Sequence, residues 1–295
     1  MARNLDFLIM NGAGNRFAVF DAWDAPGFAL TDAEVRRICQ PGGAAMGELG
    51  GDQLIIVRRP RAEGASCFME IRNRNGGEVD ACGNATRCVA WLWFRDMGES
   101  ECVVETNADQ LRCWKVGTHT ATWGDVRVDM GEPRLGWADI PLAEPMHTHH
   151  IDVKLGPIDA PVLHNPGAVS MGNPHCVFFV DDFERARPEQ VGPMVEFFPL
   201  FPEQANVSFA RVDAPGPDGL DRMRLRVWER GVGITQACGT AACAAVVAGV
   251  RQKRLAREAE VELDGGTLRI RWDEETNRVL MTGPVELEAE GVVGV

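Results

Sequence analysis

The sequence predicts an α+β protein made of two similar halves, each with several strands around one buried helix. Two observations lead to this fold class. The tripeptide Ala-Cys-Gly occurs twice, at residues 81–83 and 237–239, and each copy opens an apolar run typical of a buried helix. Short runs rich in β-branched residues surround both helices and indicate strands.

The two cysteine segments are one pattern repeated. Residues 70–84 align with residues 226–240 without a gap, and five of the fifteen positions are identical. The identical positions include Arg74 with Arg230 and both cysteines. We infer an internal duplication, and the length of 295 residues suits about two ordinary domains.

The first half begins with a turn in which Gly12 and Gly14 indicate close backbone approach. The capping-box spacing of Thr31 and Glu34 predicts a short helix after it. The residues from Cys82 to Met97 are mostly apolar, which predicts a helix buried on most sides. Strands are predicted at 53–57, 66–72, 102–105, 111–116 and 126–130.

The second half repeats this order of strands and helices after the break at Gly131-Glu-Pro133, where we place the domain boundary. A helix is expected near 189–197, and a second apolar helix from Cys238 to Leu255 ends in cations that suit a helix C-terminus. Strands are predicted at 151–155, 173–180, 223–228, 260–263, 267–272 and 279–282.

Composition narrows the class of function. The net charge of -13 disfavours binding to nucleic acid or to an acidic membrane surface, because both would repel the chain. The N-terminus lacks the apolar run of a signal peptide, and no stretch approaches the ~18 apolar residues of a membrane span. We therefore expect a cytoplasmic protein, and an enzyme acting on a small molecule stays open.

The nine cysteines do not read as a disulfide framework, because their number is odd and the chain is long for a stapled scaffold. No CxxC pair occurs, which disfavours a structural zinc site. The histidine cluster His147, His149 and His150 is the other metal candidate. It has no partner motif and reads as a solvated loop.

A cysteine at the start of a buried helix suits acid-base chemistry. The first turn leaves N–H groups without partners and carries partial positive charge, which favours a thiolate and also binds a carboxylate. Two such helix starts facing each other would hold one carboxylate between two thiols. One thiol would then remove the hydrogen from the adjacent carbon, and the other would return one on the opposite face.

The alternative is that the cysteines are small core residues, as cysteines outside disulfides frequently are. We keep that interpretation for the seven cysteines outside the repeat. They are Cys39, Cys67, Cys88, Cys102, Cys113, Cys176 and Cys243. Because Cys82 and Cys238 lie in the duplicated segment, we interpret these two as functional residues instead of core residues.

With these motifs in place, the chain resembles diaminopimelate epimerase, an isomerase of the lysine and peptidoglycan pathway that uses no cofactor. The resemblance runs nearly end to end, and its segments are 12–17, 52–57, 78–88, 171–175, 201–206, 228–231 and 236–242. It implies two pseudo-symmetric domains, each a β-barrel wound around a central helix. The C-terminal strand would return to the first domain, which gives domains 1–131 with 277–295 and 132–276.

Carried over residue by residue, the resemblance assigns Cys82 and Cys238 as the acid and base thiols and His175 and Glu229 as the catalytic side chains that tune them. Further positions correspond to groups that hold the substrate, chiefly its non-reacting end: Asn15, Gln53, Asn73, Asn173, Asn206, Glu229 and Arg230. The starts of the helices, Gly83, Asn84, Gly239 and Thr240, correspond to the binding site of the reacting carboxylate. Taken alone, each asparagine is more often a turn residue and His175 more often a core histidine.

Some positions depart from the family pattern. Asn11 stands where a histidine is frequent, Arg16 where an aspartate is frequent, and Ile234 where a glutamate is frequent. Ala85 and Ala241 replace common glycines. These changes leave the thiols and the Glu-Arg pair intact, so they bear on fine substrate preference rather than on reaction class.

The resemblance implies interconversion of LL- and meso-2,6-diaminopimelate without pyridoxal phosphate and without a metal. The expected partner is diaminopimelate, with no nucleic acid and no membrane, and a homodimer is the candidate assembly. Two alternatives remain: another racemase on this fold, acting on proline or hydroxyproline, and a non-catalytic or metal-binding protein whose cysteines are structural. Asn73, Asn206 and Arg230 favour diaminopimelate over the smaller substrates of the other racemases, since they can bind a distant charged end of the substrate.

Overall fold

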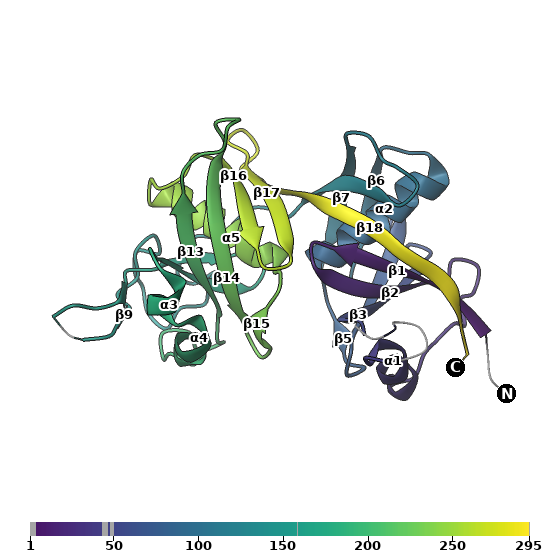
Figure 1. The fold of residues 1–295 in the computed structure, drawn as a ribbon, viewed down its shortest axis with the longest axis horizontal. Helices are drawn as coiled ribbons and strands as arrows, with labels where there is room; N and C mark the ends of the chain where they lie inside the picture. Colours follow the sequence, from purple (N-terminus) through teal and green to yellow (C-terminus); the bar gives the residue numbers. More distant parts are fainter. Residues whose placement is uncertain (1–3, 43–46, 48–49, 158, 295) are drawn as a thin grey trace. The chain divides into compact units, whose positions relative to one another are not determined.

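The computed structural model describes residues 4–42, 47, 50–157 and 159–294, and the chain forms two compact units (Figure 1). Unit 1 comprises Met1–Asp129 and Thr282–Val295, and unit 2 comprises Met130–Met281. The limits of the two units lie within a few residues of the predicted domains, 1–131 with 277–295 and 132–276. We keep the predicted domains as a proposal.

Unit 1 is a closed barrel of eight strands. Their order around the barrel is β1, β2, β3, β4, β6, β7, β8 and β18, and the pairing of β1 with β18 closes the circle. The bounds are β1 (Asn4–Gly12), β2 (Asn15–Asp21), β3 (Gln53–Arg58), β4 (Cys67–Asn73), β6 (Glu101–Glu105), β7 (Gln110–Val116), β8 (Trp123–Asp129) and β18 (Val279–Gly294). The short strand β5 (Glu78–Val79) pairs with β4 outside the circle.

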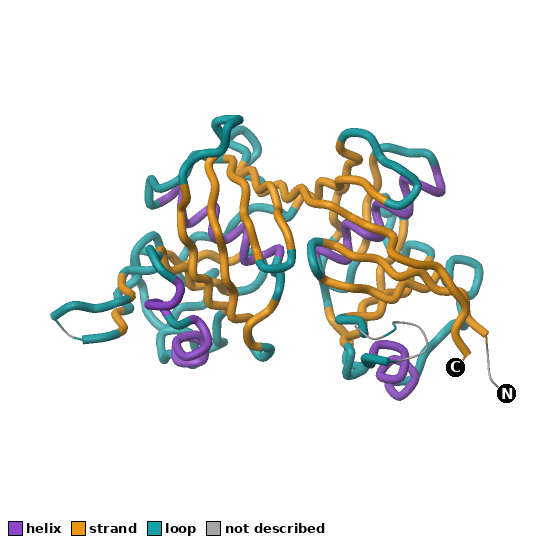
Figure 2. Tube along the Cα trace, viewed as in Figure 1, coloured by secondary structure: helices purple, strands orange, loops and turns teal. Residues whose placement is uncertain are grey.

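Helix α2 (Gly83–Met97) lies inside this barrel, where it contacts β1, β2, β6, β7 and β8 (Figure 2). Ten of its fifteen residues are buried, and Gly98 ends it in the left-handed conformation that glycine favours. Outside the barrel, α1 (Asp32–Cys39) begins with both hydrogen bonds of the capping box of Thr31 and Glu34. Both helices were predicted from the sequence and are confirmed.

Unit 2 has the same architecture around α5 (Gly239–Arg251). Its strands are β11 (Gly167–Ser170), β12 (Pro174–Phe179), β13 (Asn206–Asp213), β14 (Asp221–Glu229), β15 (Gly233–Thr235), β16 (Glu258–Leu263) and β17 (Gly266–Trp272). Helix α5 contacts β11, β12, β13, β16 and β17, so strands surround it. The remaining elements are α3 (Phe183–Ala186), α4 (Pro188–Glu196), β9 (Lys154–Leu155) and β10 (Leu163–His164).

The segment 130–134 closes the barrel of unit 2. Arg134 forms an antiparallel bridge with Ser170 at the end of β11. On the other side, Met130 N–H donates to Val279 O, and Val279 N–H donates to Gly131 O, at the start of β18. Because β18 also neighbours β17, the circle of strands around α5 is complete.

Strand pairings in the two units correspond one to one. In unit 1 the second strand pairs with the third in parallel, and the fourth with the sixth in parallel, while the other neighbours are antiparallel. Unit 2 shows the same sequence of parallel and antiparallel pairings. The duplication inferred from fifteen aligned residues therefore extends to the whole topology.

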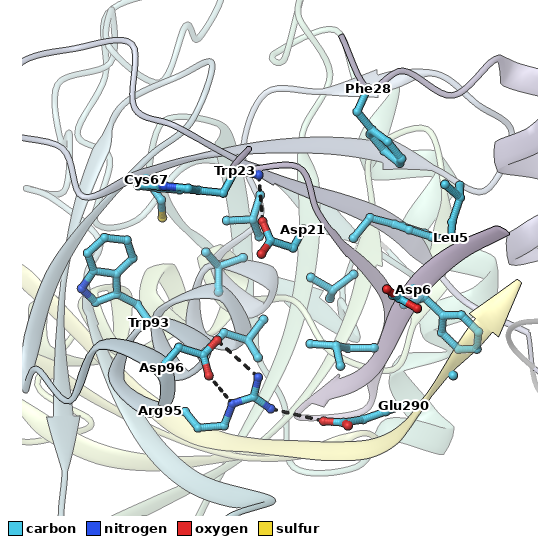
Figure 3. Close-up of a pocket in the computed structure, with 18 of the residues that line it drawn as sticks. Leu5, Asp6, Asp21, Trp23, Phe28, Cys67, Trp93, Arg95, Asp96 and Glu290 are labelled. Carbon is cyan, nitrogen blue, oxygen red and sulfur yellow. Dashed lines mark hydrogen bonds and ion pairs between the residues drawn. The ribbon is translucent and has the colours of Figure 1, made fainter. Parts of the chain in front are cut away.

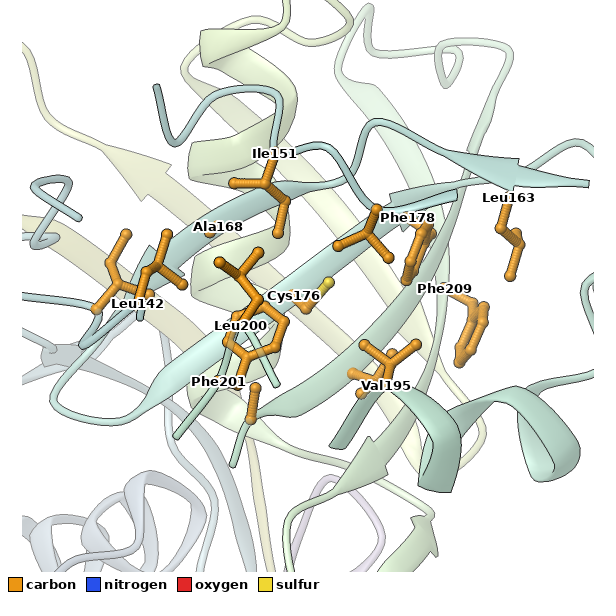
Figure 4. Packing of buried hydrophobic residues seen from close by; sticks show 14 of the residues in the cluster. Leu142, Ile151, Leu163, Ala168, Cys176, Phe178, Val195, Leu200, Phe201 and Phe209 are labelled. Atoms are coloured by element: carbon orange, nitrogen blue, oxygen red, sulfur yellow. The ribbon is translucent and has the colours of Figure 1, made fainter. Parts of the chain in front are cut away.

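Each barrel also has an apolar layer on its outside. In unit 2 this layer includes Phe178 and Phe209, whose rings stack with centroids 6.0 Å apart, and Val195 of α4 (Figure 4). In unit 1 the corresponding layer packs Val35 and Ile38 of α1 against the barrel. Burial of such side chains contributes about 1.5–3 kcal/mol each and fixes the strands whose ends carry the polar residues.

Three sequence expectations need correction. The strand predicted at 151–155 is reduced to Lys154–Leu155, because Ile151 and Val153 are buried in a loop whose backbone bonds to residues 165 and 166. The second long helix ends at Arg251 rather than at Leu255, since Lys253 takes a positive φ of 58°. The last strand extends to Gly294, because it pairs with β1. Over the described residues, no helix is long and apolar enough to cross a membrane.

Candidate active site

Cys82 and Cys238 occupy the same position in the two units, the N-cap of the enclosed helix. Cys82 has φ -150° and ψ 110°, and Cys238 has φ -137° and ψ 111°. Neither side chain forms a capping hydrogen bond to its helix. The first-turn N–H groups of α2 and α5 are therefore not capped by the thiols, and the positive end of each helix lies beside a sulfur.

In unit 1, asparagines connect the helix start to the first hairpin. Asn84 Nδ2 donates to Asn15 Oδ1 at 2.5 Å, and Arg87 Nη1 donates to Asn84 Oδ1 at 2.9 Å. Gly12 lies against the same turn of α2, where a Cβ atom would come within 2.9 Å of Asn84 O. The predicted close approach at Gly12 is confirmed. Gly14 instead adopts the positive φ of 90° that the turn requires.

Two further residues of unit 1 come together at the end of the neighbouring strands. Gln53 at the start of β3 is paired in register with Asn73 at the end of β4. Gln53 Nε2 donates to Asn73 Oδ1 at 3.1 Å. Asn73 is exposed and Gln53 is partly buried, so both present polar atoms at this end of the barrel.

In unit 2, Cys238 belongs to a hydrogen-bonded group. Its Sγ lies 3.5 Å from Thr240 Oγ1, which also accepts from Asn173 Nδ2 at 3.5 Å. Asn173 Oδ1 in turn accepts from His175 Nε2 at 2.9 Å. An amide oxygen only accepts, so Nε2 carries the ring hydrogen and Nδ1 holds a lone pair. Within the described residues, this buried Nδ1 has no hydrogen-bond partner.

Glu229 is the carboxylate of this group. Burial raises its pKa, and hydrogen bonds with Thr235 and with Cys238 partly oppose that shift. Thr235 Oγ1 donates to Glu229 Oε1 at 2.5 Å. Thr235 was not predicted from the sequence, although its place directly before the cysteine segment could have indicated it. A carboxylate in contact with the thiol of Cys238 is placed to accept its proton.

Asn206 and Arg230 lie at the same end of these strands: Asn206 is paired in register with His175, and Arg230 directly follows Glu229 at the end of β14. Asn206 Nδ2 donates to Pro174 O at 3.1 Å, and Arg230 N–H donates to Asn206 Oδ1 at 3.0 Å. The side chain of Asn206 is thus largely used in holding the turn. Arg230 is exposed, and its Nη1 donates to Glu203 O at 2.9 Å.

The two units share one framework but differ in their titratable groups. Residue two of each helix bonds to an asparagine at the start of a strand: Asn84 to Asn15 in unit 1, and Thr240 to Asn173 in unit 2. Glu229, at the end of β14, occupies the place that Asn73 has at the end of β4. The register against β3 and β13 likewise places Phe17 where unit 2 has His175. Only unit 2 therefore supplies ionisable side chains at these positions.

His175 is held neutral by its surroundings. Burial, and then the charge of Arg230, lower its pKa from the ordinary 6.5 to about 3. The unfolded chain binds a proton at this histidine below pH 6.5 and the folded chain does not, so the free energy of unfolding falls as the pH decreases from 6.5 toward 3. A neutral imidazole with an available lone pair is a hydrogen-bond acceptor at physiological pH.

This linkage gives a measurable stability difference. We expect the wild-type protein to lose about 2 kcal/mol more unfolding free energy between pH 6.5 and pH 5 than the His175→Gln variant, at ~1.4 kcal/mol per pH unit. Urea unfolding at both pH values measures it. His164→Gln, at an exposed histidine of unit 2, is the control and should follow the wild type. A His175→Gln variant as acid-sensitive as the wild type would contradict the assignment.

The seven cysteines outside the repeat are buried, as predicted for core residues. Burial raises the pKa of Cys39 to about 11 and that of Cys67 and Cys88 to about 12, which makes these thiols poor nucleophiles at neutral pH. His147, His149 and His150 are exposed. Over the residues that the structure describes, no group of three or more metal-ligating side chains gathers.

A cavity of about 860 Å³ in unit 1 lies away from these residues. Trp23, Trp93 and Cys67 are among the residues that line this cavity. At its edge, Arg95 donates hydrogen bonds to Asp96 and Glu290 (Figure 3). Its lining from α2 begins at Val89, whereas Cys82 precedes the N-terminus of the helix, about 10 Å from Val89 along the axis. None of the predicted site residues lines this cavity.

Comparison with known proteins agrees with this geometry. The family described as Diaminopimelate epimerase matches residues 7–136 and 167–288. The diaminopimelate epimerase of Acidiphilium cryptum is 48% identical over 291 residues, which cover 99% of this chain and 97% of the relative. That of Afipia carboxidovorans is 46% identical over 292 residues, covering 98% of this chain and 95% of the relative.

Among solved structures, the hydroxyproline epimerase of Agrobacterium vitis with bound trans-4-hydroxy-L-proline aligns over 99% of this chain and 91% of that chain. Its TM-score is 0.64 at 14% sequence identity, which shows the shared fold. A predicted epimerase of Pseudomonas aeruginosa has a TM-score of 0.64 at 17% identity, over 98% of this chain and 99% of that one. Since the family match covers most of the sequence and the relatives are nearly half identical from end to end, the chain belongs to the diaminopimelate epimerase family.

Proposed function

We propose that this protein interconverts LL- and meso-2,6-diaminopimelate by a two-base mechanism that uses Cys82 and Cys238. The observation that carries the proposal is the repeated helix start, in which the same cap conformation puts a thiol at the N-terminus of the enclosed helix in both units. Inverting a carbon requires one group to remove its hydrogen and a second to deliver hydrogen to the opposite face. A duplicated unit provides two such groups.

Glu229 is the proton acceptor that we assign to Cys238. The carboxyl already shares a hydrogen bond with this thiol, and its second contact, from Thr235, fixes its orientation. When Glu229 takes the thiol proton, the resulting thiolate is the base for the carbon-bound hydrogen. Burial raises the pKa of Glu229, so it holds that proton more readily than an exposed glutamate does.

His175 is the second side chain that we assign to tuning the thiols. Unit 1 has Phe17 and Asn73 at the positions where unit 2 has its histidine and glutamate, so unit 1 itself offers no ionisable group there. The lone pair on His175 Nδ1 has no partner within the described residues. We propose that this atom accepts a hydrogen bond during the reaction.

The reacting carboxylate is assigned to the two helix starts. Gly83, Asn84, Gly239 and Thr240 follow the two cysteines directly, and N–H groups of a first helical turn bind anions. The distal amino acid group is assigned to Arg230 with the amides of Asn15, Gln53, Asn73, Asn173 and Asn206. This division leaves the chemistry to the thiols and the selectivity to the amides and the guanidinium.

The reaction is tested by incubating the protein with LL-diaminopimelate in deuterated water. We expect the loss of one Cα hydrogen, its replacement by deuterium and the appearance of the meso isomer, followed by NMR. Omitting pyridoxal phosphate and adding a chelator should not change the rate. If neither exchange nor isomerisation occurs, the proposed function is wrong.

The selectivity assignment predicts a specific effect of Arg230→Met. We expect the KM for diaminopimelate to rise about 10-fold or more, since a charge-assisted hydrogen bond to the distal carboxylate is lost. Exchange with lysine, which lacks that carboxylate, should change little. Arg224→Met is the matched control: Arg224 lies in β14, which ends directly before Arg230, and forms ion pairs with Glu262 and Asp264. Equal effects on both substrates would make Arg230 structural and favour a racemase of smaller amino acids.

The assembly and the location of the protein complete the proposal. We propose a homodimer that acts in the cytoplasm on diaminopimelate, with neither nucleic acid nor membrane as a partner. Sedimentation equilibrium over a range of concentrations measures whether the protein is a homodimer.

A further inference from the structure

The strongest feature outside the assigned roles is a group of three side chains around Glu288. Asn11 Nδ2 donates to Glu288 Oε1 at 3.0 Å, and Arg16 Nε donates to Glu288 Oε2 at 2.6 Å. The two side chains thus meet on one carboxylate, which no sequence motif brought together with them.

A β-bulge turns Glu288 toward this group. In the pairing of β1 with β18, Ile9 is opposite Ala289 and Met10 is opposite Leu287, so Glu288 is the extra residue of the bulge. Bulges redirect a side chain and are frequent next to functional sites. The side chains of Arg16 and Glu288 are 19% and 24% exposed, so this ion pair is shielded from water more than an ordinary surface pair.

The same group fixes the first hairpin. Asn11 and Arg16 are opposite each other across it, and the turn residues Ala13 and Gly14 both have positive φ. Asn11 Oδ1 accepts from Gly14 N–H at 2.9 Å, which holds the turn from within. Arg16 Nη1 also donates to Gly50 O at 3.0 Å, so Arg16 connects β18 to the residues that lead into β3.

From the hairpin, contacts lead to the start of α2. Asp52 Oδ2 accepts from Arg16 N–H at 2.9 Å and from Asn15 Nδ2 at 3.5 Å. Asn15 Oδ1 accepts from Asn84 Nδ2, and Gly12 lies against Asn84 O. A shift of the hairpin would therefore move the Asn15 amide and the first turn after Cys82 together.

We propose that Asn11, Arg16 and Glu288 form a brace that positions Asn15 and the first turn of α2 for substrate binding. The three are positioning residues, since they act through Asn15 and Asn84. The inference rests on the proposed function for its effect on catalysis, but the positioning of α2 is a property of the protein alone.

The test compares Glu288→Gln and Arg16→Met with Glu70→Gln as the matched control. Glu70 pairs with Arg58 in the same barrel, the two side chains are 21% and 20% exposed, and Arg58 lies at the end of β3 opposite to Gln53. We expect the brace variants to lower kcat/KM by about 3-fold to 100-fold, the upper figure being that for a substrate group displaced by ~1 Å. The control should change it by less than about 2-fold, although Glu70 pairs with both Arg58 and Arg72, because these ion pairs lie away from Asn15. Thermal unfolding should show similar melting temperatures for all three.

A double-mutant cycle isolates the route of the effect. In an Asn15→Ala background, Arg16→Met should cause little further loss, because its effect passes through Asn15. Amide hydrogen exchange at residues 83–86 should accelerate in Arg16→Met and Glu288→Gln but not in Glu70→Gln. This second measurement needs no substrate, so it separates failure of the brace from failure of the proposed function. Additive losses in the cycle, or unchanged exchange at 83–86, would overturn the brace.

Discussion

Replacing either helix-start cysteine by alanine is expected to lower epimerisation by about 10²- to 10⁴-fold, the usual contribution of one general acid or base. Each face of the substrate carbon needs its own proton donor or acceptor, so Cys82→Ala and Cys238→Ala should be similarly severe. Cys88→Ala and Cys243→Ala are the matched controls, because they make the same change at buried positions within the same two helices. Near-normal turnover by either N-cap variant would exclude two-base chemistry.

Isotope exchange makes this prediction sharper. A variant with one remaining thiol can still remove a hydrogen and return deuterium on the same face, without inversion. We therefore expect Cys82→Ala to exchange the Cα hydrogen of one isomer only, and Cys238→Ala to exchange that of the other. Both experiments use LL- and meso-diaminopimelate in deuterated water with NMR detection. Exchange of both isomers by one variant would mean that a single group serves both faces.

Mild oxidation of the substrate-free enzyme is expected to abolish activity through a disulfide between Cys82 and Cys238. In the proposed mechanism the two sulfurs flank one carbon, at roughly 7 Å from each other when each lies about 3 to 3.5 Å from it. A disulfide needs sulfurs ~2 Å apart, which a substrate between them prevents. Saturating substrate should therefore protect the enzyme, and a reductant should restore activity.

Peptide mapping of the oxidised protein checks which thiols have reacted. Cys102 and Cys113 are directly opposite each other on β6 and β7, so they are the internal alternative for a disulfide. A Cys102→Ala variant that still loses activity on oxidation assigns the loss to the helix-start pair. Loss of activity with Cys82 and Cys238 both still thiols, or without protection by substrate, would mean that they do not approach the same carbon.

Much of the fold was predictable because its signals are local. The Ala-Cys-Gly repeat marked both helix starts, Thr31 and Glu34 marked the cap of the short helix, and β-branched runs marked most strands. The residues that closed each barrel were not predictable in this way. The pairing of β1 with β18 joins residues almost a chain length apart, and residues 130–134 close unit 2 without forming a named strand.

The sequence by itself determined the family, the duplication and the identity of the two thiols, because these depend on residue type and on spacing within short segments. The resemblance also assigned His175 and Glu229 to these thiols, but only the tertiary structure shows the contacts that each of these side chains makes. The contact of Glu229 with Cys238, the orientation given by Thr235 and the lone pair of His175 depend on burial and on strand register. The meeting of Asn11, Arg16 and Glu288 depends on a bulge in a strand more than 270 residues away along the chain. Electrostatics and hydrogen bonds act over a few ångströms in space, and spacing in the sequence does not encode which distant atoms those are.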